Sequence, residues 1–309
     1  MFMTRRQWIT VAATAPLAAA VAQAKTKPVA RPKGKGYAPR IACACYVFEQ
    51  DYARRNQKTI DHVDEIFATF KQAGYHAVEL MSGYFPADGS ERTLALLDQH
   101  GLIMPIVYIG GPMHDDRSQS TVDQTLALAA RVKPHKHVEA ISFNCDPKPD
   151  HASKTDAELQ VEALALDRLG AALGREGLRL LVHQHAPEMA DHSREWRYFV
   201  NNTTAKNVGL CLDTHWVYRG GDDVMQILRE AGPRLGDMHL RNSRGGVWLE
   251  ELADGDIDYS AVAAELKQLK YRGWLSVELA WDANTQFTRD LGENLRRSRE
   301  YAERVFGVK

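Results

Sequence analysis

Carboxylate and imidazole side chains recur where short apolar segments of this sequence end. The residues at these ends are Glu79, Asn144 to Asp146, His183 to His185, Asp213 to His215, His239 and Glu278. Gathered in one place, such groups would form a partly buried charge cluster, which is costly unless a cation neutralises it. The sequence therefore predicts that these side chains surround a metal ion.

Four of these residues form the predicted ligand set, namely His183, Asp213, His239 and Glu278. Two imidazoles and two carboxylates make a mixed nitrogen and oxygen set that suits Mn²⁺, Zn²⁺, Co²⁺ or Fe²⁺. We therefore expect one divalent metal ion as the cofactor. The ligand types leave open which metal it is, and the spacing leaves open whether His183 or His185 is the inner ligand.

Other residues near the segment ends are candidates for substrate contact, each with a structural alternative. Glu79 could bind a substrate hydroxyl or cap the loop that follows it. Trp216, next to His215, could stack on a sugar face or pack in the core. Arg244 and its neighbour Arg241 could meet an anionic group or lie in a solvated loop. The predicted substrate-binding set is Glu79, His215, Trp216 and Arg244.

A single unit repeats along the chain and must position these residues. It consists of an amphipathic helical stretch, a turn with glycine and a short apolar run. The apolar runs, which we expect to be strands, are 40–46, 76–81, 102–109, 138–144, 178–185, 208–213, 235–240 and 274–279. Helices are expected at 60–72, 90–100, 119–132, 155–175, 193–202, 222–231, 259–270 and 289–305.

Strands that alternate with helices pair in parallel, because each strand is reached through a crossover. Eight such strands predict an α/β protein with a single (β/α)8 TIM barrel over residues 40–309. An open doubly wound sheet is the competing fold, but no GxGxxG follows any of the runs and the even strand count favours closure. Barrel active sites lie at the carboxyl ends of the strands, where the predicted ligands occur.

The first 24 residues are predicted to be a twin-arginine-type signal peptide. Arg5 and Arg6 precede an apolar run over residues 9–21, and residues 22–24 read Ala-Gln-Ala, a small-x-small cleavage pattern. A membrane anchor is the alternative, but this run is short for a span that needs roughly 20 residues. Residues 25–39 would be a flexible leader. We expect a periplasmic protein that uses the twin-arginine export machinery and has no stable membrane anchor after cleavage.

Composition narrows the choice of partners. Lys plus Arg is 39 and Asp plus Glu is 40, so the formal net charge is −1. This balance builds no basic field for a phosphate backbone, which argues against nucleic acid as a partner. A small molecule is the expected partner, and the oligomeric state is open.

Four cysteines, Cys43, Cys45, Cys145 and Cys211, lie in the apolar runs. Cys43 and Cys45 lack the CxxC spacing of redox and zinc sites. Buried free thiols are therefore expected in place of disulfides.

Several motifs resemble the xylose isomerase-like TIM barrels, the sugar phosphate isomerase/epimerase superfamily. They are 75–80, 208–216, 237–242 and 275–279, with a glycine-containing turn at 255–259. The resemblance runs from about residue 40 to the C-terminus and implies that Asp213, His239 and Glu278 bind metal. Ketose epimerases usually have a glutamate as the fourth ligand, where this sequence has His183. The run from His183 through His185 to Glu188 resembles the HxHxxE version of inosose dehydratase-like and keto-glycoside-cleaving relatives.

The resemblance implies proton abstraction next to a carbonyl, with stabilisation of an enediolate. Glu278, His185 and Glu188 are the candidate bases. The first hypothesis is an isomerase or epimerase of an unphosphorylated sugar. The alternatives are a lyase or dehydratase acting on a keto-sugar, 3-keto-glycoside or keto-cyclitol, and a non-catalytic periplasmic sugar-binding barrel. An apurinic endonuclease is disfavoured by the charge balance.

Overall fold

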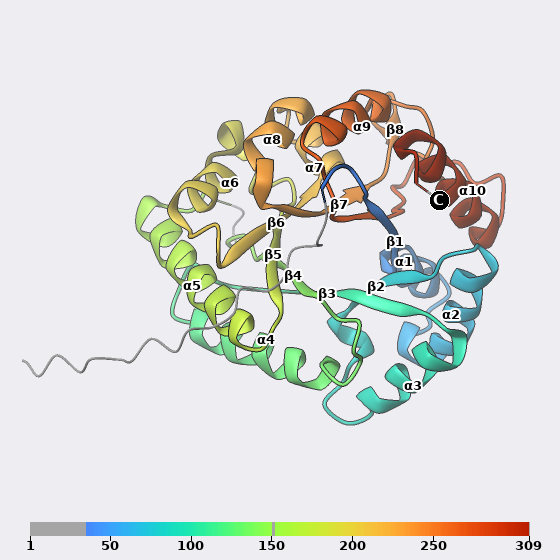
Figure 1. The fold of residues 1–309 in the computed structure, drawn as a ribbon, viewed down its shortest axis with the longest axis horizontal. Coiled ribbons are helices and arrows are strands. Elements are labelled where there is room, and N and C mark those ends of the chain that lie inside the picture. The colour runs from blue at the N-terminus through green and yellow to red at the C-terminus, as the bar shows by residue number, and fades with distance from the viewer. Residues whose placement is uncertain (1–34, 150–151, 309) are drawn as a thin grey trace, which may run out of the picture.

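Eight parallel strands close into a barrel surrounded by helices (Figure 1). The computed structural model describes residues 35–149 and 152–308. The strands are β1 (Arg40–Ala44), β2 (Ala77–Met81), β3 (Ile103–Gly111), β4 (Ala140–Cys145), β5 (Arg179–His183), β6 (Val208–Asp213), β7 (Leu235–Leu240) and β10 (Trp274–Val277). Around the barrel they follow the order β1, β10, β7, β6, β5, β4, β3, β2. The predicted (β/α)8 barrel is confirmed, and each predicted strand overlaps an observed one.

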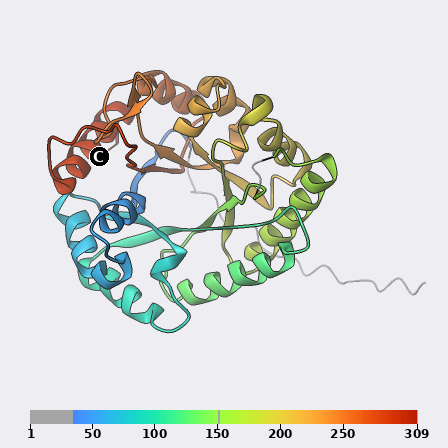
Figure 2. The same cartoon turned by 180° about the vertical axis from the view of Figure 1, so that it is seen from behind.

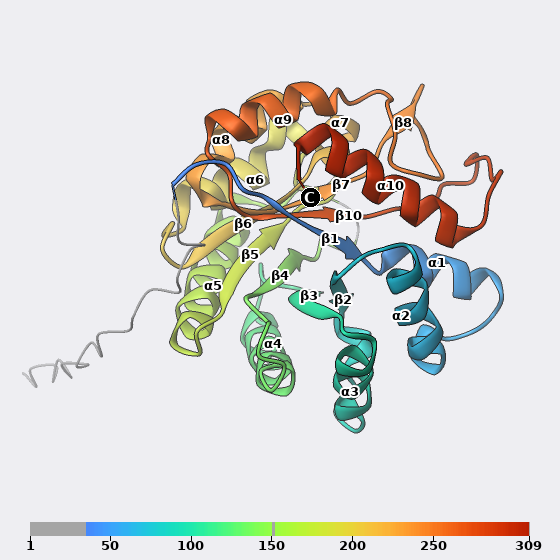
Figure 3. The same cartoon turned by 45° about the vertical axis from the view of Figure 1, so that its right-hand side comes forward.

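Helices form the outer layer on all sides of the barrel, as the views from behind and from the side show (Figures 2 and 3). They are α1 (Tyr46–Arg54), α2 (Val63–Gln72), α3 (Ser90–His100), α4 (Ser118–Val132), α5 (Asp156–Arg175), α6 (Ala190–Asn202), α7 (Thr214–Arg219), α8 (Val224–Ala231), α9 (Tyr259–Gln268) and α10 (Leu291–Phe306). Several begin at residues that accept hydrogen bonds from their first turn. Thr155 and Glu158 form a capping box at α5, and Asp223, Asp258 and Asp290 cap α8, α9 and α10.

The structure differs from the predicted elements in several places, and helix α7 lies where no element was predicted. The first predicted strand continued to residue 46, but β1 ends at Ala44 and α1 begins at Tyr46. The predicted helix 60–72 is divided into a 3-10 turn over Thr59–His62 and α2. An antiparallel hairpin of β8 (Ser243–Arg244) and β9 (Val247–Trp248) lies where no element was predicted. Strand β5 ends at His183, which leaves His185 in the loop that follows.

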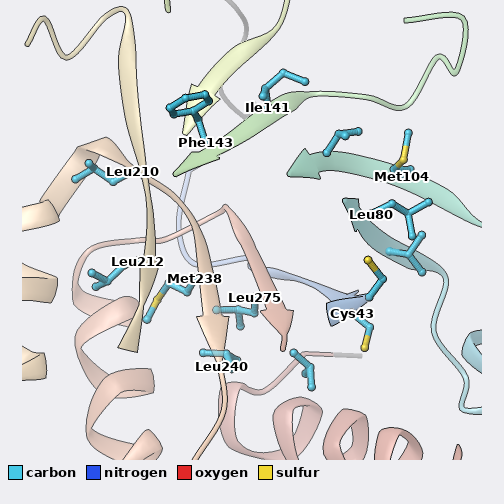
Figure 4. Packing of buried hydrophobic residues seen from close by; sticks show 14 of the residues in the cluster. Cys43, Leu80, Met104, Ile141, Phe143, Leu210, Leu212, Met238, Leu240 and Leu275 are labelled. Atoms are coloured by element: carbon cyan, nitrogen blue, oxygen red, sulfur yellow. The ribbon is translucent and has the colours of Figure 1, made fainter. Parts of the chain in front are cut away.

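Alternation along each strand separates core residues from site residues. In β6, Leu210 and Leu212 belong to the large core between strands and helices, which Figure 4 shows from close by. Cys211 belongs to a small apolar cluster inside the barrel, together with Ala42, Ala77, Ile106, Ala140, Leu181 and Trp274. Asp213 follows Cys211 by two residues and so points to the same interior. The apolar cluster fills the barrel away from the carboxyl ends of the strands, and the polar residues occupy the interior at those carboxyl ends.

Polar contacts close the barrel at the end opposite to the strand carboxyl termini. Strand β1 pairs with β10, with Arg40 opposite Trp274. The Arg40 guanidinium donates hydrogen bonds of 2.6 and 2.9 Å to the Glu139 carboxylate and lies 3.9 Å from the centroid of the Trp274 ring. The Tyr37 hydroxyl donates to the backbone oxygen of Phe306, 2.8 Å away. The first strand is therefore tied to the end of the barrel.

Two glycines of helix α5 have opposite surroundings, which makes a matched prediction. A Cβ at Gly170 would overlap the carbonyl oxygen of Asn207, whereas a Cβ at Gly174 would meet nothing within 4 Å. We expect Gly170→Ala to destabilise the protein by about 1–3 kcal/mol, because the backbone of two segments must separate. Gly174→Ala is expected to stabilise it by about 0.5–1 kcal/mol through helix propensity. Denaturant titration measures both, and equal effects would contradict the close packing at Gly170.

The cysteines and the N-terminal segment are the subjects of the remaining predictions. All four cysteines are buried and free, as predicted. No helix among the described residues is long and apolar enough to cross a bilayer. Arg5, Arg6, the cleavage site and most of the predicted leader lie outside the described residues.

Candidate metal centre

Four neighbouring strands bring the predicted ligand set together. His183 ends β5, Asp213 ends β6, His239 lies in β7 and Glu278 directly follows β10. One ligand atom from each of these side chains lies within 4.8 Å of the others. The His183 Nε2 is 3.6 Å from the Asp213 Oδ2, and the His239 Nδ1 is 3.3 Å from the Glu278 Oε1.

The two histidines present unpaired nitrogens to this cluster. Among the described residues, the His183 Nε2 and the His239 Nδ1 are buried and have no hydrogen-bond partner. The other nitrogen of each ring is held, since the His183 Nδ1 lies 3.2 Å from the Asn144 Oδ1 and the His239 Nε2 lies 2.9 Å from the Glu79 Oε2. Metal-binding histidines are oriented in this way by a partner on the second nitrogen. The residues therefore fit a single divalent cation held by two nitrogens and two carboxylates.

Arg241 is the cation already present in this cluster. Its buried guanidinium lies 2.8 Å from the Glu278 Oε2 and also forms an ion pair with Asp213. Burial would raise the pKa of Glu278, but Arg241 and His239 outweigh burial and hold that pKa well below its usual range. The guanidinium carbon lies about 5 Å from the ring centroids of Trp216 and Trp248, at 5.1 and 5.0 Å. Arg241 therefore lies between the two ligand carboxylates and the aromatic side of the site.

A cavity of about 410 Å³ opens at the carboxyl ends of the strands and is lined by two of the four residues, His239 and Glu278. Its wall contains residues from nearly every strand end. They are Ala44, Cys45, Tyr46, Glu79, Met81, Tyr108, His185, Ala186, Pro187, Trp216, His239, Arg241, Trp248 and Glu278. A concave pocket of this size, with a few polar groups that converge at its floor, is typical of a small-molecule site.

Three residues of the predicted site line this cavity besides the candidate ligands His239 and Glu278. Glu79 lies at its floor with one carboxylate oxygen on His239, and burial raises the Glu79 pKa to about 7. His185 lies beside His183, with the two ring centroids 4.8 Å apart. Burial lowers the pKa of His185 to about 3, so its imidazole is neutral. Trp216 meets the edge of the His185 ring at a centroid distance of 5.4 Å.

Three other predicted residues do not line the cavity. Glu188 is buried beneath the loop after β5, where its carboxylate accepts a hydrogen bond of 2.9 Å from the backbone N–H of His185. His215 is buried and accepts a hydrogen bond of 3.0 Å from the indole N–H of Trp248. Arg244 is exposed in the hairpin and donates to the backbone oxygen of Asp254. The structure thus places Glu188 and His215 as supports of wall residues and Arg244 outside the site.

Trp248 is a site residue that the sequence did not single out, whereas Asn144 was named only as a strand-end residue and Arg241 only as a possible contact to an anionic group. For Arg241 a signal exists, because it follows His239 by two residues and alternation extended past the end of β7 places both side chains in the barrel interior. Trp248 reaches the site through an unpredicted hairpin. Asn144 reaches His183 across 39 residues of chain, which no local pattern reveals.

The carboxylate of Glu79 yields a prediction about metal affinity. Because it holds the second nitrogen of His239, we expect Glu79→Ala to weaken binding of Mn²⁺ or Zn²⁺ by about 10- to 100-fold. Glu79→Gln, which keeps an oxygen that can accept the His239 N–H, is expected to lose less. Titration calorimetry with a competing chelator measures both affinities. Equal affinity in Glu79→Ala and the wild type would contradict the orienting contact.

Comparison with known proteins agrees with this architecture. Residues 67–304 match the model of the xylose isomerase-like TIM barrel family. The chain is 24% identical to the inosose dehydratase of Geobacillus kaustophilus over 252 residues, which cover 71% of this chain and 80% of that enzyme. It is 28% identical to the inosose dehydratase of Salmonella typhimurium over 147 residues, 41% of this chain and 48% of that enzyme, so this match spans about half of the relative's length.

Solved structures show the same fold at low identity. L-ribulose 3-epimerase superposes with a TM-score of 0.69 at 18% identity, covering 87% of this chain and 95% of that chain. The 3-keto-D-glucoside 4-epimerase from E. coli superposes with a TM-score of 0.64 at 17% identity, covering 86% of this chain and 99% of that chain. From its closed barrel, its four converging candidate ligands and these matches, the chain belongs to the xylose isomerase-like TIM barrel family, and its homologues are carbohydrate-modifying enzymes.

Proposed function

We propose that this protein is a metal-dependent lyase that eliminates water or an alcohol from a keto-sugar, 3-keto-glycoside or keto-cyclitol. The observation that carries the proposal is His183 at the end of β5, beside the neutral His185. Both nitrogens of His183 are committed, one to Asn144 and one to the metal position, so this ligand has no proton to exchange with a substrate. Epimerisation by paired carboxylates on opposite sides of the site therefore has no counterpart at β5.

Elimination needs only one acid–base group on one face of the substrate. His185 lines the cavity beside the candidate ligand His183, and this position places its imidazole to accept the proton on the carbon next to the carbonyl. The carbon–hydrogen bond and the bond to the β-oxygen break, a carbon–carbon double bond forms, and the imidazolium of His185 returns the proton to the departing oxygen. The products are an unsaturated ketone and water or an alcohol.

The other polar groups stabilise the charge that develops. A divalent ion held by His183, Asp213, His239 and Glu278 would polarise the carbonyl of the substrate. Arg241 directs a buried positive charge at the same end of the cavity, where it favours an enolate oxygen. Glu278 is less suited than His185 as the base, because its carboxylate is paired with Arg241.

An epimerase is the second candidate, because a second acid–base group is present on the wall. Glu79 lies on β2, across the site from the β5 loop, and burial raises its pKa to about 7. One of its carboxylate oxygens is buried without a partner among the described residues. Glu79 and His185 together would allow a proton to leave one face and return on the other.

Product analysis in D2O tests the proposal. Metal-loaded protein is incubated with a 3-keto-glucoside, a keto-inositol and D-fructose, and the products are followed by NMR. Release of the alcohol or water with formation of an unsaturated ketone supports the lyase. An epimer with deuterium at the α-carbon and no eliminated product would replace it with the epimerase. Saturable binding without any product from the three compounds would favour a non-catalytic sugar-binding barrel.

A histidine variant tests the assigned base. His185→Gln is expected to abolish elimination while the metal content stays unchanged, because His185 is outside the cluster of four. His137→Gln changes an exposed histidine far from the cavity and serves as the control. Full activity of His185→Gln would transfer the role to Glu278.

We also propose an unphosphorylated substrate met outside the cytoplasm. Among the residues that line the cavity, the one permanent cation is Arg241, and its charge is already matched by Asp213 and Glu278. The paired arginines Arg5 and Arg6 support export. Cell fractionation of the wild type and of the double variant with lysine at both positions tests the location, and cytoplasmic retention of the wild type would contradict it.

A further inference from the structure

The cavity above the candidate metal centre has one wall that contains almost no hydrogen-bonding side chain. This wall is formed by the ends of β1, β2 and β3 and by the loop after β5. We call it the apolar wall, and its residues are Ala44, Cys45, Met81, Tyr108, Ala186 and Pro187. Tyr46 and His185, which also line the cavity, adjoin this wall in sequence, and the charged side chains lie at the floor and on the side of β7 and β10.

The two polar atoms of the apolar wall are poorly placed to bind several hydroxyls. The Cys45 sulfur already accepts a hydrogen bond of 3.4 Å from the backbone N–H of Met81. Burial raises the pKa of the Cys45 thiol well above its usual value, so it carries no charge. The remaining polar side-chain atom is the Tyr108 hydroxyl, and the Tyr108 ring meets the edge of His183 at a centroid distance of 5.6 Å.

The opposite side of the cavity has the chemistry that a sugar ring requires. Trp216 and Trp248 meet edge to face with centroids 5.6 Å apart, and Arg241 lies beside both rings. Aromatic faces pack against the C–H face of a sugar, and the neighbouring polar groups fix its orientation. A carbonyl-bearing ring bound here would lie in the part of the cavity lined by two of the candidate ligands, His239 and Glu278.

We infer that the apolar wall binds an apolar, aromatic substituent attached to the sugar of the substrate. The inference rests on the proposed lyase function, since the substituent would leave as the alcohol. A free hexose would place several hydroxyls against the apolar wall, where they lose water and only the Tyr108 hydroxyl offers a side-chain partner. An aromatic ring would instead contact Met81, Pro187 and the Tyr108 ring, which are all partly exposed to the cavity in its absence.

Equilibrium binding of compounds that cannot react tests whether the apolar wall prefers an aromatic substituent. Phenyl β-D-glucoside and methyl β-D-glucoside, neither of which carries a ketone, are titrated into metal-loaded protein and followed by calorimetry. We expect the phenyl compound to bind at least about tenfold more tightly, which is the scale on which apolar pockets discriminate. Equal affinities would overturn the inference whatever reaction the protein performs.

Substitutions on the apolar wall test whether this wall causes the tighter binding of the phenyl compound. Met81→Gln and Ala186→Asp place a polar or charged group on the apolar wall and are expected to lower the ratio of phenyl to methyl affinity by about tenfold. Leu164→Gln makes a comparable change on α5, where the side chain is 59% exposed, and should leave the ratio unchanged. An unchanged ratio in both folded wall variants would overturn the assignment.

A turnover experiment separates this inference from the proposed reaction. The benzyl and methyl 3-keto-glucosides, whose departing alcohols have similar acidity, are compared under the same conditions. Elimination from both with a higher kcat/KM for the benzyl compound supports both proposals. Elimination from both at equal kcat/KM keeps the lyase and overturns the aromatic substituent. Tighter binding of phenyl β-D-glucoside with no elimination from either keto-glucoside keeps the wall and overturns the lyase.

Discussion

Asp213→Asn is expected to abolish metal binding and reduce activity more than 100-fold while leaving the barrel folded. The Asp213 Oδ1 accepts the backbone N–H groups of His215 and Trp216 at 2.8 and 3.0 Å and so caps α7. Asparagine can make the same cap, so the stability of the helix start is retained. The loss is in the ligand, because a neutral amide replaces a carboxylate. Loss of a residue that only orients a ligand typically reduces metal affinity about 10- to 100-fold, so removal of a ligand itself should exceed that range.

The same substitution at another helix start is the control. Asp223 caps α8 through the backbone N–H groups of Met225 and Gln226 but lies in an exposed segment away from the cavity. Asp223→Asn should keep about one metal ion per chain, as measured by elemental analysis, and full activity. An Asp213→Asn protein that retains metal and activity would exclude Asp213 as a ligand.

Arg241→Met is expected to lower both the stability and the activity of the protein, and added metal should restore only the stability. Without metal, the variant leaves the carboxylates of Asp213 and Glu278 buried without their cation, which destabilises a protein by about 3–5 kcal/mol. A divalent ion bound by the same carboxylates replaces the missing charge, so metal should restore much of the stability. Activity of the loaded variant should still fall by about 10²- to 10³-fold, because the charge aimed at the developing oxyanion is absent.

Thermal unfolding with and without added Mn²⁺ measures the first effect, and steady-state kinetics measures the second. Arg219→Met is the matched control, since the Arg219 guanidinium lies 4.0 Å from the Trp248 ring centroid but pairs with Asp282 in a half-exposed position. Its loss should change stability by no more than about 1 kcal/mol. If metal stabilises the wild type and Arg241→Met equally, Arg241 does not compensate the ligand charges.

The barrel and its four central residues were predictable because both depend on local periodicity. Apolar runs separated by helical stretches specify parallel strands, and parallel strands present their last residues at one end. His183, Asp213, His239 and Glu278 each lie at or directly after a strand end, so the topology alone brings them together. The family resemblance pointed to the same residues.

The parts that depend on contacts between distant segments were not predictable. Asn144 orients His183 from the neighbouring strand, and Trp248 reaches the cavity through a short hairpin with no strong strand pattern. Arg241 and Arg244 are three residues apart, yet one is buried between carboxylates and the other faces solvent. Because both residues are arginines, the difference in their burial comes from the reversal of the chain in the hairpin and not from the residue type.

The pairing of β1 with β10 has a consequence for how the chain folds as it is made. The hydrogen bond from Tyr37 to Phe306 joins residues 269 positions apart. Until β10 has left the ribosome, β1 has an unpaired edge that can associate with other chains. Contacts of such long sequence separation also form slowly. The nascent protein is therefore expected to depend on chaperones during synthesis, and its barrel closes in a late step after translation of the last strand.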